Sequence, residues 1–180
     1  MKLPTRLIAF IFVAALLVSA VSFKDASAQT TLSDEQVQRI SNNCLSIKNT
    51  LEQLHASDAL LRVNRGQIYE AMATKLMDRF NGRLGSNSLD TTGVSLVTSS
   101  YRTALTTFRT DYQLYERQLS AALKIDCDKQ PTEFHNAIEE ARTKRNKVHS
   151  DVVALHQYID DYRSAVNDFF INYERVAGAR

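Results

Sequence analysis

The chain has 180 residues, of which 22 are basic and 20 are acidic, and its formal net charge is +2 at pH 7. It has no Trp, only five Gly and only two Pro. So few helix breakers in a chain of this length favour long helices and argue against a fold rich in strands and turns. The length is sufficient for one domain with its own hydrophobic core.

An export leader is predicted at residues 1–28. Lys2 and Arg6 precede an apolar stretch, residues 7–23, and the small residues Ala26-Ser27-Ala28 follow before Gln29. This order is typical of a secretory signal peptide. The alternative is an uncleaved membrane anchor, because the stretch is at the short limit of what spans a bilayer. Both interpretations place residues 29–180 in a secreted or extracytoplasmic setting, at the cell envelope.

The basic excess belongs to the leader. Residues 1–28 contain Lys2, Arg6, Lys24 and Asp25, so residues 29–180 hold 19 basic and 19 acidic residues. A neutral domain gives no electrostatic reason to expect a nucleic-acid partner. Membrane contact is expected only through an uncleaved leader.

Cys44 and Cys127 are the two cysteines of the chain, and both belong to the predicted exported part. An even pair in an oxidising compartment is typical of a disulfide bond. Thiol chemistry or a metal site is the less favoured alternative.

The first long helix is predicted over residues 33–81. Ser33 and Gln36 have the spacing of a capping box at its start. Asp58 and Arg65 interrupt an apolar seam with alternating steps of three and four residues: Val37, Ile40, Cys44, Ile47, Leu51, Leu54, Leu61, Ile68 and Met72. The turn formers Gly85-Ser86-Asn87-Ser88 then predict a reversal of the chain.

Two further helices are predicted, over residues 92–124 and 131–176. The seam of the second is Val94, Val97, Tyr101, Leu105, Phe108, Tyr112, Tyr115, Leu119 and Ala122; that of the third runs from Phe134 to Val176 in unbroken heptad steps. A sustained heptad indicates coiled-coil packing. The predicted fold is therefore all-α, an elongated up-down-up three-helix bundle in a single domain over residues 29–180.

The register of this bundle pairs Asp58 with Arg145. Each lies 14 residues beyond a position at the same end of the bundle, Cys44 and Pro131 respectively. We expect a buried ion pair near Tyr112 and Tyr115 that fixes the register of the helices. The functional alternative is a buried polar ligand site or a proton relay.

Arg65 and Gly66 occur together within Asn64-Arg65-Gly66. This sequence predicts either an arginine that extends to solvent from a continuous helix or a local kink.

No cofactor, metal or catalytic site is predicted. His55, His135, His149 and His156 lack the spacing of paired metal ligands on a helix. Neither a Gly-x-Ser-x-Gly turn nor a Gly-rich phosphate loop is present in the sequence. We therefore expect a protein that is not an enzyme.

Apolar residues crowd the end of the third helix, at Phe169, Phe170, Ile171 and Tyr173. They predict a contact surface for a partner, a membrane or a second copy. The alternative is that the turn containing Leu84 and Leu89 folds over them.

Residues 54–64 (LHASDALLRVN) and 125–131 (IDCDKQP) carry a resemblance. On these segments the chain resembles uncharacterised secreted helical proteins of the Saccharibacteria lineage. The resemblance implies an envelope or secreted setting and brings no activity.

The function predicted from these features is that of a non-enzymatic extracytoplasmic interaction or scaffold protein. A protein partner or self-association is expected. Two alternatives stay open: a periplasmic-type chaperone or carrier that holds apolar clients, and a membrane-anchored cell-surface stalk.

Overall fold

The computed structural model describes residues 32–178, and this part of the chain is all-helical, without a β-strand. The all-α prediction is confirmed. The predicted leader, residues 1–28, lies outside the described residues. The elements in chain order are α1 (Asp34–Asn42), α2 (Cys44–Ala71), the π-helix η1 (Met72–Met77), α3 (Asp78–Ser86), α4 (Thr92–Ala122) and α5 (Pro131–Ala177).

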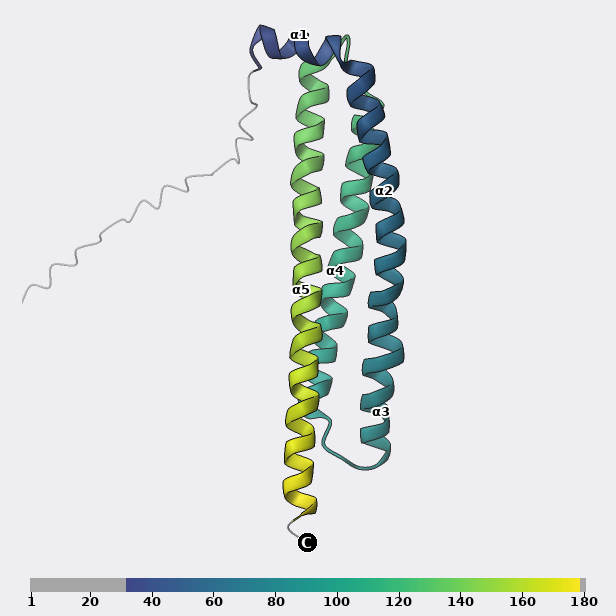
Figure 1. The fold of residues 1–180 in the computed structure, drawn as a ribbon, viewed down its shortest axis with the longest axis vertical. Coiled ribbons are helices and arrows are strands. Elements are labelled where there is room, and N and C mark those ends of the chain that lie inside the picture. Colours follow the sequence, from purple (N-terminus) through teal and green to yellow (C-terminus); the bar gives the residue numbers. More distant parts are fainter. Residues whose placement is uncertain (1–31, 179–180) are drawn as a thin grey trace, which may run out of the picture.

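Three long segments run side by side along the molecule (Figure 1). The segment α2–η1–α3 runs in one direction, α4 returns, and α5 again runs parallel to α2. The closest packing is between α4 and α5, whereas α2 has few close approaches to either. The bounds of α4 and α5 agree with the helices predicted over 92–124 and 131–176 to within two residues.

The prediction of one helix over residues 33–81 is wrong at Asn43. The capping box at Ser33 is present, but α1 ends at Asn42 and lies across the end of the long segments (Figure 1). The Asn43 side chain donates to the Arg39 carbonyl at 2.8 Å, and the same carbonyl accepts the Asn43 backbone N–H at 3.2 Å. Asn competes with the helical backbone in this way, which makes Asn42-Asn43 a natural break.

The same prediction placed the other end of the helix five residues too early. The chain stays helical to Ser86 and turns over residues 87–91, where Ser88 has a φ of 56°. Asn81 explains the extension, because its amide donates to the Thr98 hydroxyl at 2.9 Å and accepts from the Tyr162 hydroxyl at 2.9 Å. Contacts with both neighbouring segments therefore hold this stretch in a helix despite Gly82 and Gly85.

The apolar seam predicted for α2 is wrong beyond Asp58. Leu61 and Ile68 are 48% and 58% exposed, and Tyr69 is buried instead. Tyr69 lies 11 residues beyond Asp58, close to three turns of a straight helix at 3.6 residues per turn. A heptad would have required supercoiling to bring Ile68 inward, whereas the half-buried Met72 does pack against the core. In the π-helix η1, Ala73 and Met77 continue the buried face of this segment.

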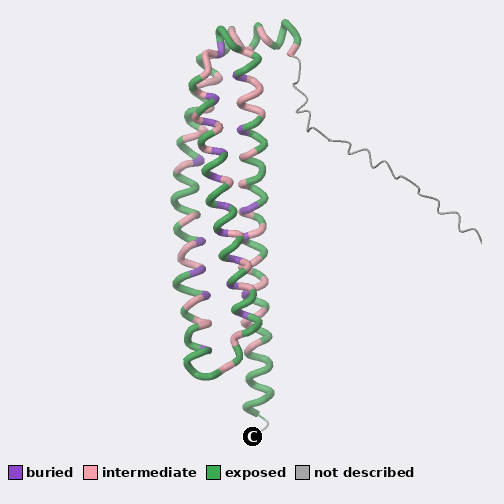
Figure 2. The backbone as a smooth tube through the Cα atoms, turned by 180° about the vertical axis from the view of Figure 1, so that it is seen from behind, coloured by how far each residue is buried: buried purple, intermediate pink, exposed green. Residues whose placement is uncertain are grey.

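The core follows the seam predicted for α4. All nine predicted positions of that seam are buried except the half-buried Val97. The main cluster joins this seam to Tyr69, Met77 and Leu84 of the first segment and to Leu155 and Tyr162 of α5. Figure 2 shows that buried positions become scarce toward the C-terminal end of α5, which is exposed.

Candidate functional site

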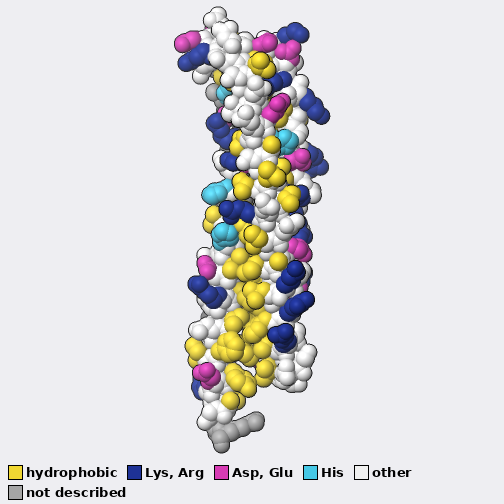
Figure 3. Space-filling view, turned by 45° about the vertical axis from the view of Figure 1, so that its right-hand side comes forward, with side chains coloured by type: hydrophobic (Ala, Val, Ile, Leu, Met, Phe, Trp, Pro, Cys, Tyr) yellow, Lys and Arg dark blue, Asp and Glu magenta, His cyan; other side chains and the backbone are white. Residues whose placement is uncertain are grey.

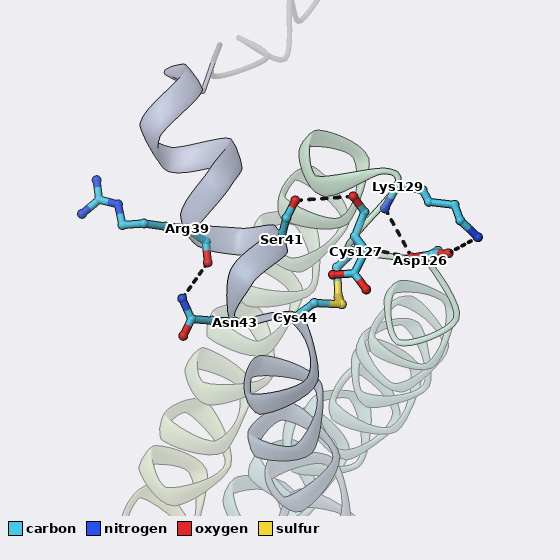
Figure 4. Close-up of a disulfide and its surroundings, with 8 residues drawn as sticks. Arg39, Ser41, Asn43, Cys44, Asp126, Cys127 and Lys129 are labelled. Carbon is cyan, nitrogen blue, oxygen red and sulfur yellow. Dashed lines mark hydrogen bonds and ion pairs between the residues drawn. A yellow bond between two sulfur atoms is a disulfide. The ribbon is translucent and has the colours of Figure 1, made fainter.

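The two cysteines are joined where α2 begins. Cys44 is the first residue of α2, Cys127 lies in the loop between α4 and α5, and their Cα atoms are 5.5 Å apart (Figure 4). Cys127 is fully buried, and the nearby Ser41 hydroxyl donates to the Asp128 carbonyl at 3.4 Å. The predicted disulfide is therefore present in the structure, and it ties the loosely packed α2 to the end of the closely packed α4–α5 pair.

The structure brings Asp58 and Arg145 together. Arg145 Nε donates to Asp58 Oδ2 at 2.7 Å, and Arg145 Nη2 donates to Asp58 Oδ1 at 3.0 Å. The two bonds form a bidentate ion pair between α2 and α5. From α4, the Tyr115 hydroxyl donates to Asp58 Oδ2 at 2.7 Å. One carboxylate thus connects all three long segments.

The electrostatics of this network favour the ionised carboxylate. Burial of the Asp58 carboxyl opposes ionisation, but the hydrogen bonds from Arg145 and Tyr115 outweigh burial and hold the pKa of Asp58 below its usual value. Burial, reinforced by the hydrogen bond to Asp58, raises the pKa of the Tyr115 hydroxyl above its usual value. Tyr115 therefore remains a hydrogen-bond donor to the ionised Asp58 carboxylate.

The prediction of a buried pair holds for only one partner. The Asp58 side chain is 10% exposed, whereas the Arg145 side chain is 49% exposed. Arg145 lies at the exposed surface of α5, and its long side chain allows the guanidinium to reach the buried Asp58 carboxylate. Asp58 accepts hydrogen bonds from Nε and Nη2 of Arg145, and the other N–H donors of the guanidinium are not used by Asp58.

A cleft opens beside this network, between α2, α4 and α5. Its volume is about 370 Å³. The rim carries Arg62, Arg65 and Arg145 in addition to Asp58, and the lining includes the aromatic side chains Phe108, Tyr112 and Tyr115. The cleft exists because the α2 seam beyond Asp58 faces solvent instead of closing onto α4. Sequence reasoning missed it for the same reason that it misplaced Leu61.

Arg65 lies in an unbroken stretch of α2 and points its exposed side chain to the rim of this cleft. The helix continues without a break through Gly66, the position of the local kink predicted as the alternative. Of the two predictions for Arg65, the structure therefore supports the arginine that extends to solvent.

A second polar cluster was missed by the sequence analysis. Lys147 Nζ lies 2.6 Å from Asp151 Oδ1 on the same helix and 3.2 Å from Asp111 Oδ2 on α4. Burial, followed by the neighbouring Asp111 carboxyl, raises the pKa of Asp151. The available signal was the spacing of four residues between Lys147 and Asp151. Asp151 lay outside the predicted seam, so its burial could not be read from the pattern.

The four histidines are dispersed. His156 shares a hydrogen bond of 3.0 Å with the Tyr69 hydroxyl, and His55 lies 3.8 Å from Glu116. Within residues 32–178, no group of three or more His, Cys, Asp or Glu side chains is placed to hold a metal ion. Over the same residues, no helix has both the length and the apolar character needed to cross a membrane.

The end of α5 extends past the turn between α3 and α4 (Figure 1). We call residues 169–176 the α5 tip. Phe169 packs edge-on against Phe80 with ring centroids 6.2 Å apart, so this residue joins the core. Phe170, Ile171 and Tyr173 are each about half exposed, at 48%, 56% and 49%. Leu84 and Leu89 pack into the main cluster and do not cover the tip.

Comparison of the chain with models of known protein families, with curated proteins and with solved structures gave no significant match.

Proposed function

We propose that the protein is a non-enzymatic, extracytoplasmic scaffold that binds a protein partner through the α5 tip. In this proposal residues 1–28 direct export, and residues 29–180 form a three-helix bundle with coiled-coil packing along α4 and α5. The disulfide between Cys44 and Cys127 supports the extracytoplasmic setting, because such bonds persist in oxidising compartments.

The observation that carries the proposal is the exposed apolar surface at the projecting end of the longest helix. Phe170, Ile171 and Tyr173 are about half exposed, and Val176 is 64% exposed. We treat these side chains as one interaction surface, because exposed apolar area concentrated in one place usually marks an interaction site. Phe80 packs against Phe169 and Phe170, with ring centroids 6.2 Å apart in each pair, and so connects the base of the tip to α3.

A protein partner fits the tip better than a purely apolar one. Charged side chains accompany the apolar residues on the same two turns, namely Asp168, Glu174 and Arg175. An apolar centre with a polar rim is the usual anatomy of a protein interface. Catalysis is not part of the proposal, since Arg145 and Tyr115 both donate to the Asp58 carboxylate and hold it in an ion pair.

The test compares a tip variant with a matched surface variant. Ile171→Ser combined with Phe170→Ser alters the tip, and Val153→Ser alters an apolar residue of the same helix with the same 56% exposure as Ile171. Residues 29–180 of each protein would be cross-linked to the surface of intact producing cells. Equal melting temperatures would show that both variants keep the fold.

We expect the wild type and Val153→Ser to give one specific cross-linked band that the tip variant loses. Sedimentation velocity then distinguishes a heterologous partner from a second copy. A band that survives in the tip variant, or the absence of any band with the wild type, contradicts the proposal.

A further inference from the structure

The cleft beside Asp58 has features of a binding site that are independent of the α5 tip. Its volume of about 370 Å³ lies within the usual range for small-molecule pockets. Leu61, Val148 and Val152 form apolar walls, and Phe108 lies among the lining residues. Figure 3 shows hydrophobic side chains gathered in a long band on one face of the molecule, flanked by basic residues.

The rim of the cleft has a surplus of positive charge. Three arginines, Arg62, Arg65 and Arg145, face one carboxylate, Asp58. Neither Arg62 nor Arg65 forms an ion pair with a carboxylate of residues 32–178. Arg145 keeps unused N–H donors after pairing with Asp58. Planar guanidinium groups with free donors bind carboxylates and phosphates through paired hydrogen bonds.

One buried polar group in the cleft is without a partner. The hydroxyl of Tyr112 is buried, and it has no hydrogen-bond partner among the described residues. Tyr112 is 6% exposed, and the guanidinium carbon of Arg62 lies 5.2 Å from its ring centroid. An unsatisfied buried hydroxyl is costly, which makes it a natural donor to a ligand oxygen.

We propose that this cleft binds a single-chain amphiphile with an anionic head. The head, a carboxylate or a phosphate, accepts hydrogen bonds from Arg62, Arg65 and the Tyr112 hydroxyl. The chain lies along the walls formed by Leu61 and Val152. Charge complementarity selects this occupant over a neutral or cationic one, because two of the three rim arginines, Arg62 and Arg65, form no ion pair with a carboxylate of residues 32–178.

The test measures binding of defined probes to residues 29–180 by isothermal titration calorimetry, below the micelle concentration of each probe. Dodecanoate and dodecyl phosphate distinguish the two head groups. Decanoate tests the contribution of the chain, since each buried methylene should change the affinity about fourfold. Dodecyltrimethylammonium, with the same chain and the opposite charge, is the control for detergent-like adsorption.

We expect saturable one-to-one binding of at least one anionic probe and none of the cationic probe. Arg62→Glu with Arg65→Glu should weaken binding at least tenfold, and Tyr112→Phe should weaken it several-fold. The matched control is Arg83→Glu, at an exposed arginine of α3 remote from the cleft. Equal binding of the cationic probe, an equal loss in Arg83→Glu, or no binding by the wild type overturns the proposal. Phe170→Ser with Ile171→Ser changes the tip and leaves the residues of the cleft unchanged. A failure of the proposed tip function can therefore be distinguished from a failure of the cleft proposal.

Discussion

Tyr69 and His156 form a hydrogen bond across 87 residues of sequence, the same separation as that between Asp58 and Arg145. Both contacts join α2 to α5, and they lie 11 residues apart on each helix. Two parallel helices with equal rise per residue keep a constant offset of this kind. The two contacts therefore define one register between α2 and α5, although few other groups of α2 reach the core.

Removal of the Asp58 carboxylate should destabilise the fold. In Asp58→Ala, Arg145 loses its partner and the buried Tyr115 hydroxyl loses its acceptor, so we expect a loss of about 1–3 kcal/mol in the free energy of unfolding. Asp58→Leu with Arg145→Leu should lose less, because no unpaired charge remains. Urea denaturation of the single and double variants measures both effects. Equal losses would argue against direct pairing.

The same carboxylate should contribute to acid unfolding. The pKa of Asp58 is lower in the folded state than its ordinary value of 3.8. Below that ordinary value the unfolded chain therefore binds a proton that the folded protein does not. The stabilisation from Asp58 is present above pH 3.8 and is lost as the pH falls through the folded pKa. Asp58→Asn should be less stable than the wild type at pH 7, and the difference in urea midpoint should shrink below pH 4.

Asp151 should have the opposite pH dependence. Its pKa is raised above 3.8, first by burial and then by Asp111, and Lys147 opposes the shift. Between 3.8 and the folded pKa the folded protein binds a proton that the unfolded chain releases, so stability falls as the pH rises through this window. Asp151→Asn should remove that fall. Urea midpoints from pH 4 to pH 7 measure it, with the exposed Asp168→Asn as the control. A variant with the same pH slope as the wild type would contradict this account.

The disulfide should contribute strongly to stability because it closes a long loop. Cys44 and Cys127 are 83 residues apart, and the chain-entropy relation gives about 4–5 kcal/mol for such a loop. Cys44→Ser with Cys127→Ser should unfold at lower temperature and urea concentration than the wild type. The wild type treated with reductant should match it. Hydrogen exchange should increase most in α2, the long helix with the fewest buried side chains. Uniform exchange along all helices would contradict this assignment.

Gly66 offers a stabilising substitution. It lies inside a continuous helix, and a Cβ atom placed there would meet no atom within 4 Å. Gly66→Ala should therefore raise the free energy of unfolding by about 0.5–1 kcal/mol. Gly82→Ala in α3, equally free of neighbours, is the matched control. Destabilisation by the first substitution alone would show that the chain needs glycine at this position.

The sequence predicted α4 and α5 well, and α2 poorly, for a physical reason. Every turn of α4 contacts the core, so its buried face is visible as an apolar pattern. In α2, the buried positions beyond the middle of the helix are the polar Asp58 and the amphipathic Tyr69, while Leu61 and Ile68 face solvent. A pattern based only on apolar residues therefore identifies the wrong face of α2 as the buried one.

Part of the candidate site was accessible from the sequence and part was not. Asp58 and Arg145 could be paired because each interrupts a seam at the same height. The cleft could not be predicted, since Leu61 was expected in the buried seam and instead lines an open cleft, 48% exposed. The break at Asn43 depends on a side-chain hydrogen bond to the Arg39 carbonyl, and such capping contacts compete closely with helix continuation.

The stability and the length of a small protein usually depend on the same residues. In the end of α5 that extends past the turn between α3 and α4, the two properties are separate. The aromatic contacts of α5 with Phe80 of α3 involve Phe169 and Phe170, so the residues beyond Phe170 add length without adding to the core. Each additional turn of α5 would carry the tip about 5.4 Å further from the disulfide. In related proteins, changes in the length of this helix after Phe170 would therefore alter the distance at which a partner is met while leaving the folded scaffold unaffected.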